Sequence, residues 1–322
     1  MNSSARKRIL VANDGSEHSL RMVEYVSSIL DRSRFEVVLY HVVTRVPESF
    51  IDSGQKAPAY RYRLVSVDAW EEKQRQTIES FMEKARSILL HAGFPDDAVT
   101  VKIEDRQAGI ARDIVAESRS GYRALVVGRR GLSDFKDFML GSVAEHILGL
   151  VPIPLWVVGG GIRPAKVLVC LDGSEESMIS LAHLAEVLEP SGSIEINLFH
   201  AVPSFHSFRN FMREVLSSEA DKKAIEKIHS ELDQAASMMQ PSFDKAREIL
   251  ISGGVDTARI HQKIARGVSN PAHAIVQEAE DGACDTIIVG RRGLSKLEEF
   301  TIGRVGGRVV QMAKNRTVWV VC

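Results

Sequence analysis

One six-residue segment occurs twice in this chain, and its neighbours repeat with it. The sequence Gly-Arg-Arg-Gly-Leu-Ser fills residues 128–133 and again residues 290–295. Each copy follows a short apolar run, at 124–127 and at 286–289, which has the length of a buried strand and is too short for a helix. Another glycine and a helical pattern come after each copy. The chain is therefore predicted to be a duplication of one unit, in which a glycine-rich loop joins a strand to a helix.

The order of the other segments repeats as well. A strand that ends in Asp-Gly-Ser appears at 8–16 and again at 167–174, and each half closes with an apolar strand that carries a tryptophan. Strands alternate with helical patterns, which predicts βαβ units and a parallel sheet. A length of 322 residues suits two ordinary domains. We therefore expect an α/β protein with two tandem doubly wound domains, residues 1–160 and 161–322, each a five-stranded parallel sheet with helices on both faces.

The two halves differ in their middle parts. In the first half, residues 47–62 are predicted to form an exposed loop, and a long helix is predicted over 65–91 with Trp70 and Ile78 on its apolar face. In the second half, a helical region over 208–239 is rich in Glu, Lys and small apolar residues. That composition favours a solvated helix surface over a dedicated partner site.

The first glycine-rich loop has the residues that an anion site needs. Gly128, Gly131 and Gly141 allow a ligand to approach the backbone, and Ser142 is predicted to cap the following helix. Backbone N–H groups at such a strand-to-helix junction can bind a phosphate. The alternative is a plain turn, because glycine spacing alone is weak evidence. The second copy of the loop favours the binding site.

Ligands of open parallel sheets bind beyond the carboxyl ends of the strands. At the end of the first strand, Asp14 is placed to accept a hydrogen bond from a ribose hydroxyl, although a turn Asp that bonds its own backbone is the alternative. After the second strand, Val42 offers apolar surface to a base. Of Arg129 and Arg130, only one is expected to face a ligand and pair with phosphate.

The spacing Gly-x2-Gly-x9-Gly-Ser, together with Asp-Gly-Ser after the first strand of each half, resembles the ATP-binding loop region of universal stress proteins. The resemblance covers nearly the whole chain and is to the tandem form of this family, with an adenine nucleotide alpha hydrolase-like fold. It implies ATP, ADP or AMP as ligand, with or without Mg²⁺. It places the base between Val42 and the segment Ala12, Asn13 and Asp14. It places the phosphates on Gly128, Arg130, Gly131, Gly141, Ser142 and Val143.

The second copy of the site departs from this pattern. Its corresponding residues are Asp172, Ala201, Gly290, Arg292, Gly293, Gly303 and Arg304. Arg304 replaces Ser142, a long cation in place of a capping hydroxyl, and Ala201 replaces Val42 on the base side. Arg304 would either fill the phosphate space or bind a phosphate with its guanidinium. We expect the second site to be degenerate.

Several functional classes are disfavoured by the sequence. A net charge of −1 gives no reason to expect nucleic-acid binding, and no apolar run approaches the roughly 20 residues of a membrane span. The Walker pattern of P-loop NTPases and the Rossmann glycine pattern are absent. His41 and His200 occupy matching strand ends, which indicates a shared structural role. No catalytic residue and no metal-binding spacing emerges.

The favoured function is that of a cytoplasmic stress or regulatory protein that binds an adenine nucleotide without efficient turnover. Three unclustered cysteines and the lack of a signal-type segment favour the cytoplasm. The alternatives are a slow ATP hydrolase or phosphotransferase, on fold analogy alone, and a nucleotide-free interaction scaffold. The closing strands, 154–158 and 317–321, are expected to pair so that the halves form an intrachain pseudo-dimer. A protein partner is expected but not named, and further homodimerisation stays open.

Overall fold

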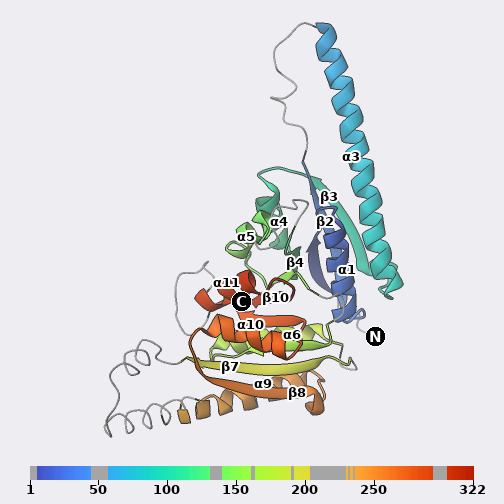
Figure 1. Cartoon of the computed structure of the whole chain (residues 1–322). Coiled ribbons are helices and arrows are strands. Elements are labelled where there is room, and N and C mark those ends of the chain that lie inside the picture. The colour runs from blue at the N-terminus through green and yellow to red at the C-terminus, as the bar shows by residue number, and fades with distance from the viewer. Residues whose placement is uncertain are drawn as a thin grey trace, which may run out of the picture. The chain divides into compact units, whose positions relative to one another are not determined.

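A computed structural model describes residues 6–44, 57–130, 140–160, 164–189, 192–203, 230, 233–234, 236–292 and 303–322, without the side chains of 57–69. The chain divides into two compact units (Figure 1). The first unit comprises residues 1–28 and 32–153, and the second comprises residues 29–31 and 154–322. The predicted domain limits, 1–160 and 161–322, stay a prediction.

The first unit is a parallel sheet with strand order β3-β2-β1-β4, and its helices follow the strands in alternation. The elements in chain order are β1 (Lys7–Ala12), α1 (Glu17–Ile29), β2 (Phe35–Val43), α3 (Ala57–His91), β3 (Val99–Asp105), α4 (Ile110–Ser118), β4 (Tyr122–Gly128) and α5 (Ser142–Leu148). The order places β1 in the middle, beside β2 and β4. This is the doubly wound arrangement that the alternating pattern predicts.

The second unit repeats this arrangement, with strand order β5-β10-β9-β6-β7-β8. All pairs are parallel except β5 with β10, which is antiparallel. Its elements are β5 (Leu155–Val158), β6 (Lys166–Cys170), α6 (Glu175–Val187), β7 (Glu195–Pro203), α9 (Gln240–Ser252), β8 (Ile260–Val268), α10 (Pro271–Asp281), β9 (Thr286–Gly290), α11 (Arg304–Met312) and β10 (Thr317–Val321). The expectation of tandem α/β domains is confirmed.

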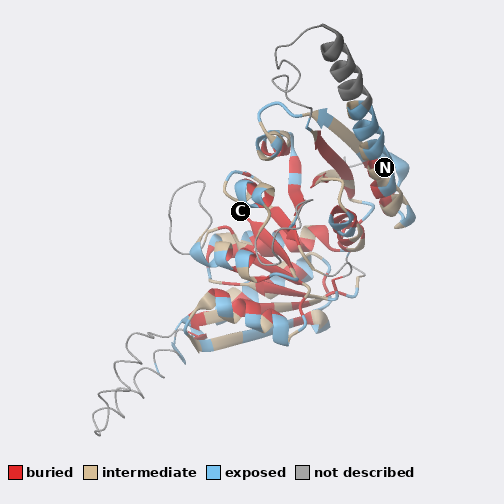
Figure 2. Cartoon of the chain, turned by 45° about the horizontal axis from the view of Figure 1, so that its top comes forward, coloured by how far each residue is buried: buried red, intermediate tan, exposed pale blue. Residues whose placement is uncertain are grey.

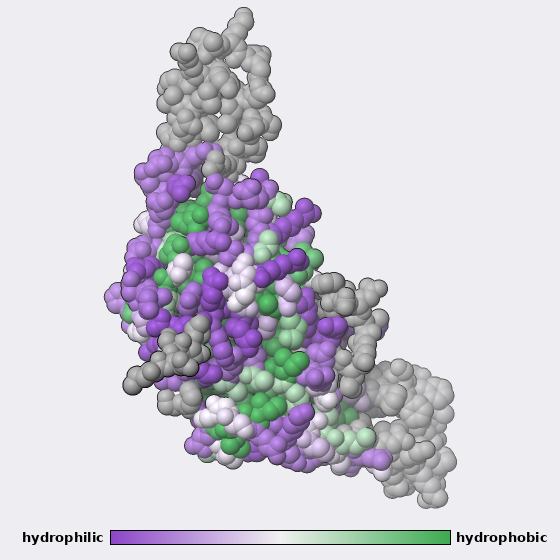
Figure 3. Space-filling view, turned by 180° about the vertical axis from the view of Figure 1, so that it is seen from behind, coloured by the Kyte–Doolittle hydropathy of each residue, from purple (hydrophilic) through white to green (hydrophobic). Residues whose placement is uncertain are grey.

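The central strands are buried along most of their length, because helices cover both faces of a parallel sheet. Ile9, Leu10 and Val11 of β1 have no exposed surface, and Val167 and Val169 of β6 are equally buried. Figure 2 shows the buried residues concentrated in the strands and on the inner faces of the helices. Figure 3 shows a largely hydrophilic surface with smaller hydrophobic patches. No helix among the described residues combines the length and the apolar character needed to cross a membrane.

The last strand of the first half, β5, belongs to the second unit. Trp156 of β5 lies opposite Trp319 of β10, and their rings stack with centroids 3.9 Å apart. The indole Nε1 of Trp156 donates to Nε2 of His183 on α6 at 3.2 Å. The predicted pairing of the two closing strands is therefore confirmed. The first unit keeps four strands, because the fifth strand of its repeat lies in the other unit's sheet.

The long helix α3 begins earlier than predicted. It starts at Ala57, so residues 57–62, which were predicted as part of a loop, are helical; residues 45–56 lie outside the described part. Pro58 is the reason for the error, because proline is compatible with the first helical turn, where its missing N–H is not needed. Most of the predicted helix over 208–239 also lies outside the described residues.

Candidate functional site

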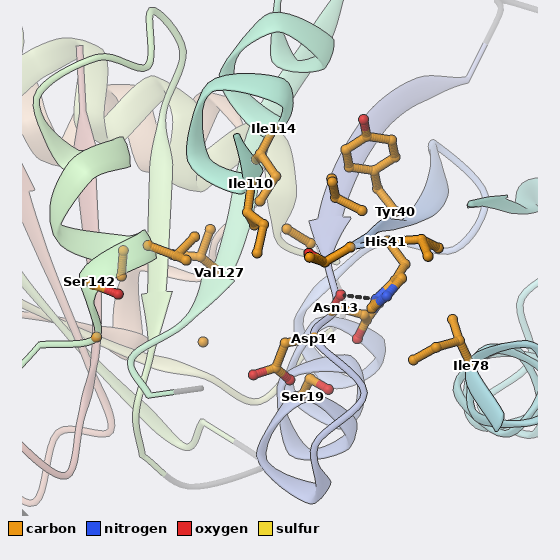
Figure 4. Close-up of a pocket in the computed structure, with 18 of the residues that line it drawn as sticks. Asn13, Asp14, Ser19, Tyr40, His41, Ile78, Ile110, Ile114, Val127 and Ser142 are labelled. Atoms are coloured by element: carbon orange, nitrogen blue, oxygen red, sulfur yellow. Dashed lines mark hydrogen bonds between the residues drawn. The ribbon is translucent and has the colours of Figure 1, made fainter. Parts of the chain in front are cut away.

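The first unit contains a cavity of about 440 Å³ at the carboxyl ends of β1, β2 and β4 (Figure 4). Nine of the ten residues predicted for the first site line it. They are Ala12, Asn13, Asp14, Val42, Gly128, Arg130, Gly141, Ser142 and Val143. The tenth, Gly131, lies outside the described residues. Residues up to 131 positions apart in the sequence, from Ala12 to Val143, thus meet at one cavity.

The turn after β1 is held by the Asp14 carboxylate. Its Oδ1 accepts hydrogen bonds from the backbone N of Ser16 at 3.0 Å and from the Ser16 hydroxyl at 2.6 Å. The same hydroxyl accepts from the backbone N of Ser19 at 3.2 Å, within the first turn of α1. Gly15 has φ +84°, a conformation that other residues rarely adopt. Asp14 therefore stabilises its own turn, as the alternative to a ribose contact proposed, and it also lines the cavity.

His41 fixes the end of β2 to the end of β1. Its Nδ1 lies 2.8 Å from the carbonyl oxygen of Asn13, so the neutral ring carries its proton on Nδ1 and donates it there. Burial lowers the pKa of His41, against the opposing effects of this hydrogen bond and of nearby Asp14. His200 makes the matching contact to the Leu171 carbonyl at 2.6 Å. The predicted structural role of the two histidines is confirmed.

The beginning of α5 differs from the prediction for Ser142. Gly141 is the N-cap residue and Ser142 is the first residue of the helix, so the capping role assigned to Ser142 is wrong. Sequence spacing could not separate these two neighbouring positions. The backbone N of Gly141 donates to the carbonyl of Arg129 at 2.9 Å, which closes the loop on itself. Ser142 lines the cavity as a helical residue.

The two arginines of the loop have different environments. Arg130 is exposed and lines the cavity, whereas Arg129 is buried, and burial together with the charge of Arg130 lowers the pKa of its guanidinium. The expectation that only one arginine faces the cavity is thus met. A Cβ on Gly128 would lie 3.0 Å from the carbonyl oxygen of Arg130. A side chain at position 128 would therefore crowd the backbone of the loop, so glycine suits this position even without a ligand.

Sequence reasoning missed the two helical walls of the cavity. Ile110 and Ile114 of α4 line one wall, and Trp70, Gln74 and Ile78 of α3 line another. Figure 4 shows Ile78 across the cavity from Ser142, with Ile110 and Ile114 above the strand ends. The spacing of four residues within each set, which places side chains on one helix face, was the available signal.

The second unit contains a matching cavity of about 560 Å³. Six of the seven predicted residues line it: Asp172, Ala201, Gly290, Arg292, Gly303 and Arg304. Gly293 lies outside the described residues. Oδ1 of Asp172 accepts from the backbone N of Ser174 at 3.0 Å and from its hydroxyl at 2.5 Å, as Asp14 does in the first unit.

The N-terminus of α11 corrects the interpretation of Arg304. Gly303 is the N-cap residue and Arg304 is the first helical residue, as Gly141 and Ser142 are in α5. Arg304 therefore does not displace a cap, and the contrast with Ser142 concerns only what each side chain offers the cavity. Nε of Arg292 lies 4.0 Å from Oε1 of Glu176, so the second cavity pairs its loop arginine with a carboxylate.

The described residues contain no group of three or more His, Cys, Asp or Glu placed to hold a metal ion. Asp14 is the carboxylate that lines the first cavity.

The Universal stress protein family matches this chain twice, over residues 5–159 and 165–321. A universal stress protein of Mycolicibacterium smegmatis is 23% identical over 316 residues, which cover 97% of this chain and 96% of that protein. Universal stress protein YxiE of Bacillus subtilis is 28% identical over 169 residues, 47% of this chain and 97% of its own length.

Solved structures share the fold. A universal stress protein from Archaeoglobus fulgidus superposes with a TM-score of 0.57 at 19% identity, covering 100% of this chain and 99% of that one. The two family matches together span nearly all of the residues, and each contains one glycine-rich loop and one cavity. The chain therefore belongs to the universal stress protein family, with two copies of the family's domain in one polypeptide.

Proposed function

We propose that this chain is a cytoplasmic regulatory protein of the stress response that binds an adenine nucleotide, ATP above all, in the cavity of its first unit. The observation that carries the proposal is the meeting of apolar, carboxylate and cationic groups around one cavity of about 440 Å³. This volume lies within the range of small-molecule sites. The order of the groups matches the order of base, sugar and phosphate in a nucleotide.

The base end of the cavity lies over β1 and β2. Val42 and Ile114 are buried apolar residues there, and Asn13 lies beneath. Nδ2 of Asn13 donates to the carbonyl of Val11 at 3.3 Å, whereas its buried Oδ1 has no hydrogen-bond partner among the described residues. Buried acceptors are normally paired. A ligand amino group that draws Asn13 toward the cavity would satisfy this oxygen.

The phosphate end lies at the junction of β4 and α5. Arg130 supplies a cation and Ser142 a hydroxyl, and both line the cavity. Asp14 lies between the two ends (Figure 4), and its proposed role is to accept a hydrogen bond from a sugar hydroxyl. The residues present therefore fit a nucleotide, with Arg130 and Ser142 on the phosphates and Asp14 on the ribose.

We propose binding without efficient turnover. Hydrolysis needs a base within hydrogen-bond reach of the attacking water. The histidine that lines the first cavity, His41, already uses Nδ1 on the Asn13 carbonyl. The carboxylate of Asp14 is engaged with Ser16. Neither group is placed as a general base beside the proposed phosphates.

Calorimetric titration of the full chain with ATP, ADP, AMP and GTP tests the proposal. We expect adenine nucleotides to bind, and Ile110→Glu to abolish binding by placing a carboxylate at the mouth of the cavity. Ile110 is 38% exposed at the first position of α4, where an acidic residue suits the helix dipole. The matched control is Leu150→Glu, at a 45% exposed residue that does not line the cavity.

Unchanged ATP affinity in the Ile110 variant would locate binding elsewhere, and absence of binding in the unmodified protein would refute the proposal. Phosphate release is measured in parallel over several hours. Release no faster than in buffer supports binding without turnover, whereas release that depends on the protein supports the hydrolase alternative. Fractionation of cells tests the cytoplasmic location.

A further inference from the structure

The long helix α3 gives the first cavity a wall that does not come from the strand ends or the glycine loop. Trp70, Gln74 and Ile78 are spaced by four residues, share one face of the helix and line the cavity. A Cβ on Gly15 would lie 3.2 Å from Cδ1 of Ile78, so Ile78 lies directly over the turn that contains Asp14. The face of α3 is thus anchored at the floor of the cavity.

Trp70 lies at the mouth of the same cavity. It precedes Ile78 by eight residues, which corresponds to about 12 Å along a helix axis. Its side chain is 47% exposed. The chain has two other tryptophans, Trp156 and Trp319, and both are completely buried in the second unit. A large aromatic side chain left half exposed beside a cavity offers its surface to whatever occupies that cavity.

The position of α3 identifies which part of a ligand Trp70 would meet. α3 packs against β2 and β3. Arg130 and Ser142 follow β4, which pairs with β1 on the side away from β2. The tryptophan wall is therefore at the end of the cavity opposite the cation and hydroxyl. Ile110 of α4 forms a separate apolar wall beside Val127, between these two ends (Figure 4).

We propose that Trp70 stacks on the purine base of the nucleotide in the first cavity and so selects ligands that carry a flat aromatic ring. This inference rests on the proposed function, because it assigns a residue to the same cavity. Stacking of a base on an aromatic side chain does not depend on a particular hydrogen-bond pattern. Trp70 would thus contact the ring system of the base, while Arg130 and Ser142 would contact the phosphates.

Titrations of the full chain with ATP and with inorganic tripolyphosphate separate these roles. Trp70→Ala should weaken ATP binding by about tenfold, a typical loss for one stacked base, and leave tripolyphosphate binding unchanged. Trp70→Phe keeps an aromatic ring and should lose about threefold or less. Gln76→Ala is the matched control, because Gln76 is an exposed residue of α3 that does not line the cavity.

Tryptophan emission gives a second measurement that a purely structural role would not change. ATP should quench the emission of the unmodified protein, tripolyphosphate should not, and the quenching should disappear in Trp70→Phe, which keeps only the two buried tryptophans. If the unmodified protein binds ATP but Trp70→Ala binds it equally well, the stacking role is refuted and the proposed function stands. If the unmodified protein binds no adenine nucleotide, both proposals fail. An equal loss of ATP and tripolyphosphate affinity would also refute stacking.

Discussion

The cavities of the two units share the hydrogen bonds that hold the strand ends and the loop, which we call the frame. They differ in the side chains that face a ligand. In both units a histidine contacts the carbonyl at the end of the first strand, through His41 or His200. A turn aspartate binds the Asp-Gly-Ser serine in both, and a glycine N–H closes the loop on an arginine carbonyl. These contacts involve backbone groups or near neighbours in the sequence. They persist although many surrounding residues differ between the repeats.

The ligand-facing positions have changed their chemistry. Leu171 occupies the place of Asn13, since each N–H donates at 2.8 Å to the second strand, and Arg304 occupies the place of Ser142. Glu176, which lies beside Arg292, corresponds to His18 in the first unit. The second cavity thus loses an amide and a hydroxyl and offsets its loop arginine with a carboxylate. The repeats show that a frame made of local contacts can be kept while the binding chemistry diverges.

The largest difference between the two cavities is expected when the charge of the loop arginine is reversed in each. Arg130→Glu should reduce ATP affinity by at least about 100-fold, because a charge-assisted contact is lost and a repulsive charge is added beside the phosphates. Arg292→Glu, the same change in the second unit, should leave ATP affinity unaltered if ATP binds in the first cavity. Calorimetry measures the ATP affinity of both variants. Similar losses in the two would mean that both cavities bind ATP.

Removal of the histidine contacts tests the shared frame. His41→Ala should lower the free energy of unfolding by about 1–3 kcal/mol, since a buried carbonyl loses its donor and a cavity forms. His200→Ala should cost less, because His200 is more exposed. Urea unfolding at pH 8 measures both.

The same histidine predicts a pH dependence. The pKa of folded His41 lies below its usual value of 6.5, so its neutral form is the one that the fold stabilises. The contribution of neutral His41 to the free energy of unfolding is complete above pH 6.5 and is lost as the pH falls below that value. The decline in stability below that pH should be shallower in His41→Ala than in the unmodified protein. Equal slopes would show that His41 does not contribute to it.

The smallest expected effect concerns the first residue of the helix after the loop. Ser142→Ala should weaken ATP binding about fivefold, the value of one hydrogen bond of about 1 kcal/mol. It should leave the stability of α5 nearly unchanged, because Gly141 and not Ser142 is the N-cap residue. Arg304→Ser is the reciprocal change, and it should not alter the affinity of the first site. A second ATP equivalent in that variant would show that Arg304 alone closes the second cavity.

Much of the frame could be predicted from the sequence, because it depends on patterns that repeat. Apolar runs, turn glycines and the two copies of Asp-Gly-Ser predicted the strand ends, and the ends of parallel strands must meet on one side of a sheet. Asp14, Val42 and the loop glycines were located in this way, whereas Ala12, Asn13 and Val143 were named from the resemblance to the family, and all of those that are described line the cavity. Helix limits depend on single residues, which is why the start of α5 was predicted one residue too late and the start of α3 eight residues too late.

The helical walls could not be predicted in the same way. Periodicity placed Trp70 on the apolar face of its helix, which suggested the core, but the structure leaves it half exposed at a cavity. A hydrophobic stripe shows which face of a helix turns inward, and it does not distinguish packed core from an open space. The repeat pattern also assigned β5 to the first domain, because it treats each repeat as a complete domain, whereas the structure places β5 in the second unit.

The strand β5 also bears on how this chain tolerates being cut. Cleavage between the repeats, near residue 160, would leave β5 held to the second unit by non-covalent contacts alone. When the two fragments dissociate, β10 becomes an edge strand with unpaired backbone groups, and the indole of Trp319 loses the ring that covers it. Exposed edge strands of this kind promote intermolecular pairing and aggregation. Proteolytic nicking of the linker should therefore act as a route to insoluble protein, even when both halves of the sequence remain otherwise intact.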